Sequence, residues 1–527
     1  MKKGGYILVL ILSIMIIFSG FAIAEHDYST ALEYSVIFFD ANRCGPEAGE
    51  DNYFDWRDAC HTQDGEDVGV DLTGGFHDAG DHMKFGLPQA YAASMLGWAF
   101  YRYEEVFKNT GIEDKYLSTL RYFGEYFLKC HADTNTFYYQ VGCPHDDHSY
   151  WGPPEEQDED RPTELVATES DTASDVLAHT AAVQVLMYFN FKDIDSDFAE
   201  EALESAKELY DMATNNLGRY ELEDFYESSS YHDDLAWGAI WLYQAEGDEE
   251  YLADAIEFIN DGSNQYGDDP FEHEWTLCWD DMYLPAMLKL YQITGDDIYS
   301  DALEYNLDYW MNSLTTTPGG LGYLDVWGVT RYASAASMLA LMYYEESGNE
   351  ELVDFALSQI NYILGDNPED LSYLLGYGEE WPQHPHHRAA NGYSYAGGEH
   401  EQPAQHLLLG ALIGGPDQDG NYIDDVNQFH YTEVAIDYNA SFVGAAAAII
   451  DYLDDYGTGE EIITGDVNGD GEVNIFDAIM MAQYIVGEID TFPVQDDMEA
   501  ADLNGDGSID IFDIILLAQY IVGETEL

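Results

Sequence analysis

The chain has 527 residues, enough for one large domain with accessory modules, and 103 acidic against 17 basic residues give a formal net charge of -86. Such a surface repels nucleic-acid phosphates and anionic membranes, which excludes both as partners, whereas a neutral polymer meets no such repulsion. With 46% hydrophobic and 14% aromatic residues, the chain is also too apolar to be disordered.

Residues 1–24 have the organisation of a secretory signal peptide. Lys2 and Lys3 form a basic start, an apolar run follows, and Ala22-Ile23-Ala24 provides a small-x-small cleavage site. We therefore predict a secreted protein, extracellular or in a cell-surface complex, with no membrane span in the mature chain. A retained membrane anchor is the alternative, and the shortness of the apolar run argues against it.

Four soft ligands lie close together in the next part of the chain, at Cys44, Cys60, His61 and His77. Thiolates and imidazoles are the ligands that zinc prefers. The alternatives are a Cys44–Cys60 disulfide, or side chains that share no role. An odd total of five cysteines leaves at least one outside any intramolecular disulfide.

Two carboxylates follow, at Asp78 and Asp81, with only Ala and Gly between them. The preceding Gly74-Gly75 lets the backbone bend sharply. Inverting hydrolysis of a glycosidic bond needs a carboxylate that activates water and a distant carboxylic acid that protonates the leaving oxygen. Taken alone, Asp-x-x-Asp favours an acidic turn or a calcium loop, so the rest of the chain decides.

Helix pairs are predicted through the middle of the chain. Gly247, Gly295 and Gly348 each end an apolar-periodic segment, and an Asp or Asn directly after each glycine begins the next helix. A unit that recurs about every 50 residues indicates an array of helix pairs. The spacing alone is compatible with both an open solenoid and a closed ring.

Residues 456–464 read as a short linker, and residues 465–527 contain one motif twice, 36 residues apart. Each copy places oxygen ligands at the positions of a calcium loop, with Gly at position 6 and a main-chain carbonyl expected from position 7. We predict two calcium ions, held by Asp466, Asn468, Asp470, Glu472, Asn474 and Asp477 in the first loop and by Asp502, Asn504, Asp506, Ser508, Asp510 and Asp513 in the second.

Position 12 of each loop is Asp, and no helix precedes either loop. In both respects the module resembles a dockerin, the domain that attaches a secreted enzyme to a cohesin on a scaffold or cell surface. The resemblance implies a cohesin partner. Dockerins carry partner-reading residues at loop positions 10 and 11, here Ile475-Phe476 and Ile511-Phe512, which we interpret as interface, with a core role as the alternative.

The stretch 422–440, with Asp424 and Glu433 among aromatic and small residues, combines with Asp78 and Asp81 in a further resemblance. Residues 25–455 resemble the catalytic domain of glycoside hydrolase family 9, whose members act on β-1,4-glucans. The resemblance implies an all-α fold, an (α/α)6 toroid, to which the small helical dockerin is added.

The resemblance also implies roles for individual residues. Glu433 matches the general acid, Asp81 the base and Asp78 its helper, while the motif at 372–388 supplies an essential His and an Arg. We therefore predict catalytic roles for Asp78, Asp81, His386, Asp424 and Glu433, with Asp424 as a supporting group, and substrate contacts for Trp151, His387 and Arg388.

Two metal sites in the catalytic domain follow from the same resemblance. Some family members carry a structural zinc near the Cys and His set described above. Residues 229–237 resemble the family's calcium loop, which predicts a calcium ion at Ser229, Asp233, Asp234 and Asp280. A charged helix N-terminus is the alternative for this acidic stretch.

The predicted function is a secreted, inverting endo-β-1,4-glucanase that hydrolyses cellulose or related β-glucans and is attached through its dockerin to a cohesin-bearing scaffold. A cellobiohydrolase, xyloglucanase or glucosaminidase of the same family is an alternative within the enzymes. A non-catalytic carbohydrate-binding subunit is the alternative from another class.

Overall fold

The computed structural model describes residues 26–219, 225–262, 269–455, 464, 465, 467, 473–485, 500–504 and 508–521. The predicted signal peptide and most of the predicted linker lie outside these residues. So do five of the predicted calcium ligands, namely Asp466, Asn468, Asp470, Glu472 and Asp506. The chain divides into two compact units, one that ends at Ala448 and one that begins at Ile449.

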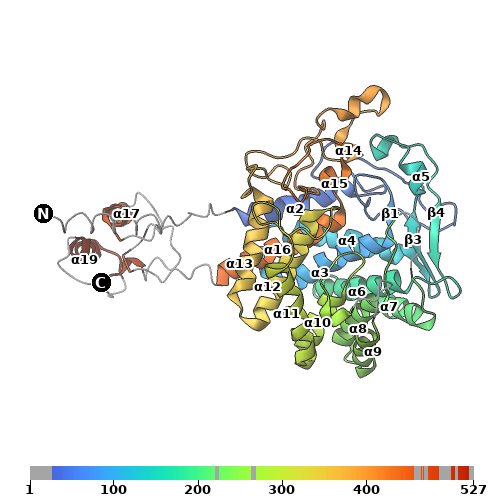
Figure 1. Ribbon diagram of the computed structural model, residues 1–527, viewed down its shortest axis with the longest axis horizontal. Coiled ribbons are helices and arrows are strands. Elements are labelled where there is room, and N and C mark those ends of the chain that lie inside the picture. The colour runs from blue at the N-terminus through green and yellow to red at the C-terminus, as the bar shows by residue number, and fades with distance from the viewer. Residues whose placement is uncertain are drawn as a thin grey trace. The chain divides into compact units, whose positions relative to one another are not determined.

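The first unit consists mainly of helices that alternate between an inner and an outer ring (Figure 1). The inner helices are α3 (Gly86–Asn109), α6 (Ser174–Phe191), α8 (His232–Glu246), α10 (Tyr283–Thr294), α12 (Val329–Ser347) and α16 (Ile436–Asp455). The outer helices are α2 (Tyr28–Asn42), α4 (Glu113–Cys130), α7 (Ser196–Asn215), α9 (Glu249–Asp261), α11 (Asp297–Asn312) and α13 (Glu350–Leu364).

Helix α16 closes the ring. The Ser441 hydroxyl lies 2.6 Å from the Tyr91 hydroxyl on α3. On the other side, Gly444 packs so closely on α12 that a Cβ atom there would lie 2.4 Å from the Met338 sulfur. The described helices therefore form a closed toroid of six pairs, which the sequence spacing alone left undecided.

The two rings differ in amphipathicity, as their places require. The inner helix α6 is buried on every side from Ser174 to Met187. The outer helix α7 buries one stripe, with Phe198, Ala202 and Leu209 at helical spacing, and turns its charged residues to solvent.

The predicted helix boundaries at the three glycines are confirmed. Gly247, Gly295 and Gly348 have φ angles of 69°, 67° and 64°, the left-handed conformation that glycine adopts at a helix C-terminus. The residues that follow them are N-caps, each of which accepts a main-chain N–H in the first turn of the next helix.

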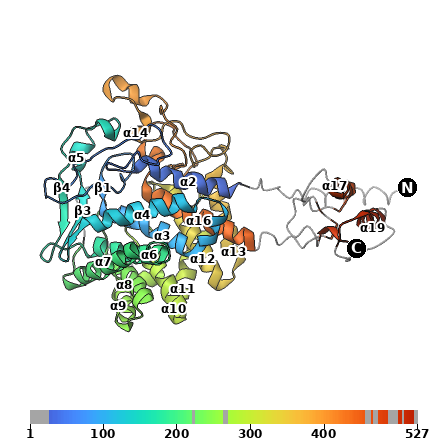
Figure 2. The same ribbon diagram turned by 180° about the vertical axis from the view of Figure 1, so that it is seen from behind.

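A small antiparallel sheet adds to the helices, and the sequence analysis missed it. Strand β3 (Thr136–Val141) pairs with β1 (Lys84–Phe85), β2 (His131–Asp133) and β4 (Thr163–Ala167). The sheet lies at the edge of the helical body beside α6 and α7 (Figure 2). The short helices are α5 (Pro144–Asp147), α14 (Arg388–Asn391), α15 (Phe429–Thr432), η1 (Pro154–Glu156), η2 (Pro270–Glu272) and η3 (Ala396–Glu401).

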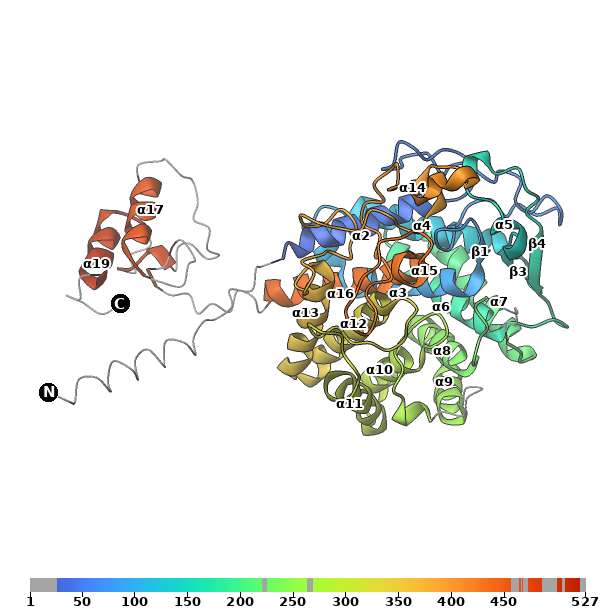
Figure 3. The same ribbon diagram turned by 45° about the horizontal axis from the view of Figure 1, so that its top comes forward.

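Helices α5, α14 and α15 gather at the same end of the toroid (Figure 3). These helices and the loops beside them carry six of the eight residues for which the sequence predicts catalysis or substrate contact, namely Trp151, His386, His387, Arg388, Asp424 and Glu433. Among the helices of the described residues, none is both long and apolar enough to pass through a bilayer.

The second unit contains α17 (Ile475–Ile485) and α19 (Ile511–Ile521), whose inner faces share one core with Met481 and Leu517 fully buried. Ile511 and Phe512 are 54% and 63% exposed. This exposure supports the interpretation of the second Ile-Phe pair as interface. The side chains of Ile475 and Phe476 lie outside the described part of the chain.

Candidate active site

The loop with Asp78 and Asp81 forms no helix or strand. Hydrogen bonds to its main-chain groups hold it in place. The Asn42 side chain on α2 donates to the carbonyls of His77 and Ala79, at 3.0 and 2.8 Å. The Asp78 N–H donates to the Met83 carbonyl at 2.9 Å, which closes a tight loop around Asp81.

Three main-chain hydrogen bonds connect this loop and the other two segments of the site to one another. Ile436 N–H donates to the Asp78 carbonyl at 2.9 Å, and Arg388 N–H donates to the Gly80 carbonyl at 3.0 Å. His386 N–H donates to the carbonyl of Thr432, next to Glu433, at 2.7 Å. The structure therefore brings together residues that the sequence separates by more than 300 positions.

Asp78 lies in the most enclosed position of the three carboxyl groups. The Tyr226 hydroxyl donates to its Oδ2, and its buried Oδ1 has no hydrogen-bond partner among the described residues. Burial, reinforced by the negative charge of Asp81, raises the pKa of Asp78 well above its usual value.

The surroundings of Asp81, unlike those of Asp78, lower the pKa of its carboxyl group. Its Oδ2 lies 3.1 Å from His148 Nε2, and its Oδ1 accepts the Ala79 N–H at 3.3 Å. Burial alone would raise the pKa of Asp81, but the hydrogen bond and charge of His148, with the nearby Arg388, hold it below its usual value. Asp81 is therefore ionised over the working range of a general base.

Glu433 ends α15 and carries a proton near neutral pH. Burial raises its pKa to about 7; a hydrogen bond from Trp327 opposes this shift, and the negative charge of Asp81 adds to it. Trp327 Nε1 donates to Glu433 Oε2 at 2.7 Å. Glu433 is thus kept neutral while Asp81, close enough to influence its pKa, is ionised. These are the protonation states that an acid and a base require.

His386 joins the acid and base segments and forms part of an aromatic row. Its Nδ1 donates to the Val426 carbonyl at 2.7 Å, and burial lowers its pKa to about 4, so the ring is neutral. Its ring lies 5.1 Å from Trp151 and 5.3 Å from Phe429, centroid to centroid. The row continues from Phe429 to Trp327 at 6.3 Å.

Two of the residues predicted to contact substrate, His387 and Arg388, are buried and bonded to other parts of the protein. His387 is buried, and its Nδ1 accepts the Ala390 N–H at 3.0 Å while its Nε2 donates to Asn42 at 3.1 Å. Arg388 is also buried and donates to the carbonyl and the carboxylate of Asp147, at 3.0 to 3.2 Å. Both residues hold neighbouring loops, whereas Trp151 is half-buried and donates from Nε1 to Asn391 at 3.0 Å.

Asp424 is bonded to the segment that precedes His386. Its carboxylate accepts the N–H groups of Gln383 and His384, each at 2.9 Å, and lies 2.9 Å from His384 Nδ1. It therefore fixes the segment that leads to His386, as expected for a supporting group.

Sequence reasoning missed His148, Tyr226 and Trp327. Each contacts a catalytic carboxyl group across 67 to 148 residues of chain. No spacing in the sequence indicates these contacts. The signal available was only that His148 and Trp327 are polar or aromatic residues in long loops.

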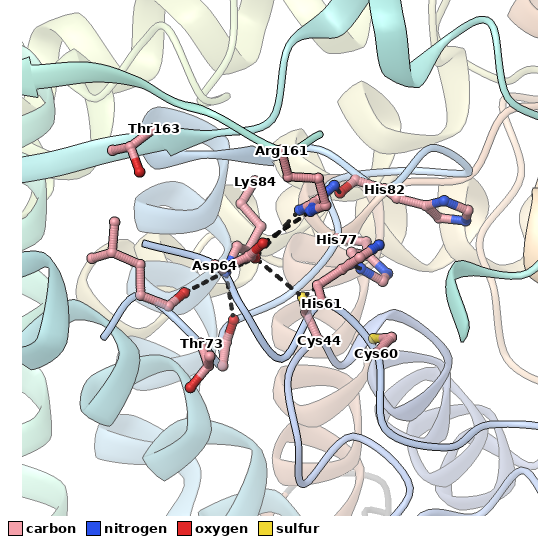
Figure 4. A network of polar contacts seen from close by, with 12 residues as sticks. Cys44, Cys60, His61, Asp64, Thr73, His77, His82, Lys84, Arg161 and Thr163 are labelled. Atoms are coloured by element: carbon pink, nitrogen blue, oxygen red, sulfur yellow. Dashed lines mark hydrogen bonds and ion pairs between the residues drawn. The ribbon is translucent and has the colours of Figure 1, made fainter. Parts of the chain in front are cut away.

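The predicted zinc ligands converge on one point (Figure 4). The ligand atoms of Cys44, Cys60, His61 and His77 all lie within 4.8 Å of one another. His61 Nδ1 lies 3.1 Å from His77 Nε2 and 3.5 Å from the Cys44 sulfur. All five cysteines are free, so the alternative of a Cys44–Cys60 disulfide is wrong for this structure.

The local charges fit a metal as well. A hydrogen bond from Cys44 and the nearby Arg57 guanidinium lower the pKa of Cys60 to about 7, against the effect of burial. At Cys60 the thiolate that zinc requires is therefore accessible near neutral pH, whereas burial raises the pKa of Cys44 well above its usual value. Behind Cys44, Asp64 pairs with Lys84 at 2.8 Å and with Arg161 at 3.0 Å (Figure 4).

Of the predicted calcium ligands of the first unit, Ser229, Asp233 and Asp234 are buried and Asp280 is partly exposed. Asp280 accepts the Ser229 N–H at 2.6 Å, Asp233 accepts the Met282 N–H at 2.7 Å, and Asp234 lies 2.8 Å from His179 Nδ1. Burial raises the pKa of Asp233 to about 7 and those of Asp234 and Asp280 well above the usual range. Among the described residues Asp233 Oδ1 is buried without a hydrogen-bond partner, as suits an oxygen that would bind a cation.

In the second unit, the aspartate at position 12 draws each predicted calcium loop together. Asp477 accepts N–H groups of Val467 and Asn474, at 3.1 and 2.8 Å. Asp513 accepts those of Asn504 and Asp510, at 3.1 and 2.9 Å. The two repeats share the bond from loop position 9, whereas the other bond comes from position 2 in the first loop and position 3 in the second. Asp502 and Ser508 also lie in the described part of the second loop.

A neutral acid and an ionised carboxylate at one end of an (α/α)6 toroid define a glycoside hydrolase site. The profile of Glycosyl hydrolase family 9 matches residues 28–446, and that of the Dockerin type I domain matches residues 464–522. The chain belongs to glycosyl hydrolase family 9 and carries a type I dockerin.

Individual relatives agree with this assignment. Endoglucanase A from Bacillus pumilus is 38% identical over 447 residues, which cover 81% of this chain and 67% of the relative. The solved structure of the cellulase Cel9M of C. cellulolyticum matches with a TM-score of 0.79 and 55% identity, over 81% of this chain and 99% of that one. The catalytic domain of Clostridium thermocellum CelT matches with a TM-score of 0.73 and 34% identity, over 81% and 96%.

The close approach at Gly80 generates a prediction. A Cβ atom at Gly80 would lie 1.8 Å from the His386 carbonyl oxygen, so Gly80→Ala forces the Asp81 loop and the His386 segment apart. We expect kcat/KM to fall by about 100-fold, the usual consequence of a displacement near 1 Å. Gly69→Ala is the control, because Gly69 has open space around it; its φ of 75°, which Gly80 does not share, makes alanine there the more strained of the two in its backbone. Equal losses in both variants would contradict the prediction.

Proposed function

We propose that this protein is a secreted, inverting endo-β-1,4-glucanase that acts on cellulose or related β-glucans and is attached through its dockerin to a cohesin-bearing scaffold. Family membership and similarity to proteins named endoglucanase and cellulase support the activity. The observation that carries the mechanism is the contrast between the raised pKa of Glu433 and the lowered pKa of Asp81.

In the proposed mechanism, Glu433 donates its proton to the glycosidic oxygen as the bond to the leaving sugar breaks. Asp81 accepts a proton from water, which attacks the anomeric carbon from the opposite face and inverts its configuration. Asp78, fixed by Tyr226, helps to hold this water, and His386 and Trp151 line the path of the glucan. An intact set of these groups argues against a non-catalytic carbohydrate-binding subunit.

The role of Glu433 has a direct test. Glu433→Gln keeps the shape of the side chain but cannot give up a proton, so kcat on carboxymethylcellulose should fall by about 1000-fold. Glu379→Gln, an exposed change in the 372–388 segment, is the control and should keep full activity. Release of reducing sugar measures both variants, and NMR of the first products should show the α-anomer. Unchanged kcat in Glu433→Gln would remove this residue from its role.

The pH dependence of the activity tests the proposed roles of Glu433 and Asp81. Activity should decline as pH rises past about 7, because Glu433 loses its proton, and should decline at acidic pH when Asp81 becomes protonated. His148→Gln removes the imidazolium that lowers the pKa of Asp81, so the acidic limb of the kcat/KM profile should move to higher pH. The alkaline limb should stay in place.

His145 provides the matched control for this experiment, since it is an exposed histidine on α5, three residues away. His145→Gln should leave both limbs unchanged. An acidic limb that does not move in His148→Gln would show that His148 has no part in setting the charge of Asp81.

The dockerin is expected to bind calcium and to fold around it. Dockerins of type I bind calcium, and here Asp477 and Asp513 close the two predicted loops. The double change Asp477→Ala with Asp513→Ala should remove two calcium ions per chain and abolish capture on a cohesin domain. Hydrolysis of soluble carboxymethylcellulose should persist, because the two units are separate.

Calorimetric titration with Ca²⁺ and cohesin measures this effect, and Asp454→Ala, at the exposed end of α16, is the control. Unchanged calcium stoichiometry in the double variant would contradict the ligand assignment.

Two metal sites in the catalytic domain are part of the proposal. Cys44, Cys60, His61 and His77 would hold a structural zinc ion, which would bind the start of the Asp78 loop to the region around Cys44. Asp233, Asp234, Asp280 and Ser229 would hold a calcium ion, which would neutralise buried carboxyl groups whose pKa values burial raises.

A further inference from the structure

Gln157 lies between the predicted zinc ligands and the catalytic loop, and it has no role in the mechanism above. It belongs to the β3–β4 segment (residues 142–162), which passes over the Asp81 loop. Its side-chain oxygen lies 2.9 Å from His61 Nε2 and 3.0 Å from His82 Nδ1. His82 follows Asp81 directly in the chain.

The two contacts decide where the imidazole protons are. A carbonyl oxygen accepts two hydrogen bonds but donates none, so His61 Nε2 and His82 Nδ1 must both carry hydrogen. The neutral His61 ring then has its free lone pair on Nδ1. That nitrogen is the one that faces Cys44 and His77, at 3.5 and 3.1 Å.

The main-chain conformation of His61 indicates that its ring is held in a specific position. His61 has a φ angle of 46°, in the left-handed region that residues other than glycine rarely adopt. This conformation directs the ring between the metal ligands and Gln157. Strained conformations of this kind persist where the surrounding contacts determine them.

The main-chain N–H and carbonyl of His82 are bonded as well. Its N–H donates to the carboxylate of Asp147, at 3.1 and 3.2 Å, and its carbonyl accepts from Arg161 at 2.7 Å. The same Asp147 carboxylate accepts from Arg388. Gln157 therefore connects the predicted metal ligand His61 to His82, the residue that follows Asp81 in the catalytic loop.

We propose that Gln157 is a positioning residue that sets the tautomer of His61 for metal binding and couples the metal site to the loop that carries Asp81. The role rests on the proposed zinc site, because it concerns a ligand of that site. Partners that orient a metal-bound histidine through its second nitrogen typically contribute 10- to 100-fold in metal affinity.

The test measures metal binding by the full chain, with Co²⁺ as a coloured substitute for zinc. Gln157→Leu keeps the volume but removes the acceptor, and we expect Co²⁺ to bind roughly 10- to 100-fold more weakly, with altered visible absorption. Gln157→Glu keeps an acceptor oxygen in place, and we expect it to retain the affinity and spectrum of the unmodified chain. Gln63→Leu is the matched control. Gln63 is exposed and, like Gln157, lines a cavity of 590 Å³.

The outcomes separate the two proposals. Equal Co²⁺ affinity and equal spectra in Gln157→Leu and the unmodified chain would overturn the role of Gln157 and leave the metal site intact. Failure of the unmodified chain to bind Co²⁺ or Zn²⁺ would overturn the metal site itself. A loss in Gln157→Leu that Gln157→Glu also shows would mean that packing, and not the acceptor oxygen, is responsible.

Discussion

The active site depends on main-chain hydrogen bonds between three segments that are distant in sequence. Asp78 is bonded to the start of α16, Gly80 to Arg388, and His386 to the residue before Glu433. These bonds fix the positions of the acid and base whatever side chains surround them. They also explain why position 80 has no room for a side chain, because the His386 carbonyl occupies that space.

Within this frame, neighbouring groups decide which carboxyl group is suited to the proposed role of acid and which to that of base. Burial acts on Asp81 and Glu433 in the same direction, because removal from water disfavours either charge. The difference comes from the partner of each group. The imidazole of His148 stabilises a negative charge on Asp81, whereas the neutral indole of Trp327 offsets little of the burial at Glu433.

Local patterns predicted the features that local physics determines. Left-handed glycines followed by N-cap residues marked the helix pairs, and the loop spacing marked the calcium motifs. Motif spacing indicated Asp78, Asp81 and Glu433. The closure of the toroid is a contact of α16 with α3 and α12, and no local pattern records it.

The same limit applies to His387 and Arg388. The motif identifies them, but only the folded chain shows that His387 Nε2 is bonded to Asn42 and Arg388 Nη1 to Asp147. The small sheet was missed for a related reason, since three of its four strands have five or fewer residues and gain their pairing from β3.

Cys44 and Cys60 are unbonded neighbours in a protein whose proposed destination is outside the cell. Oxidising compartments convert adjacent thiols to disulfides, whereas coordinated thiolates are protected. The order of events during maturation therefore matters: a polypeptide that acquires its ion before export keeps both sulfurs as ligands, and one that is oxidised first loses them. Expression in a reducing cytoplasm supplemented with zinc is therefore the way to obtain the zinc-bound protein.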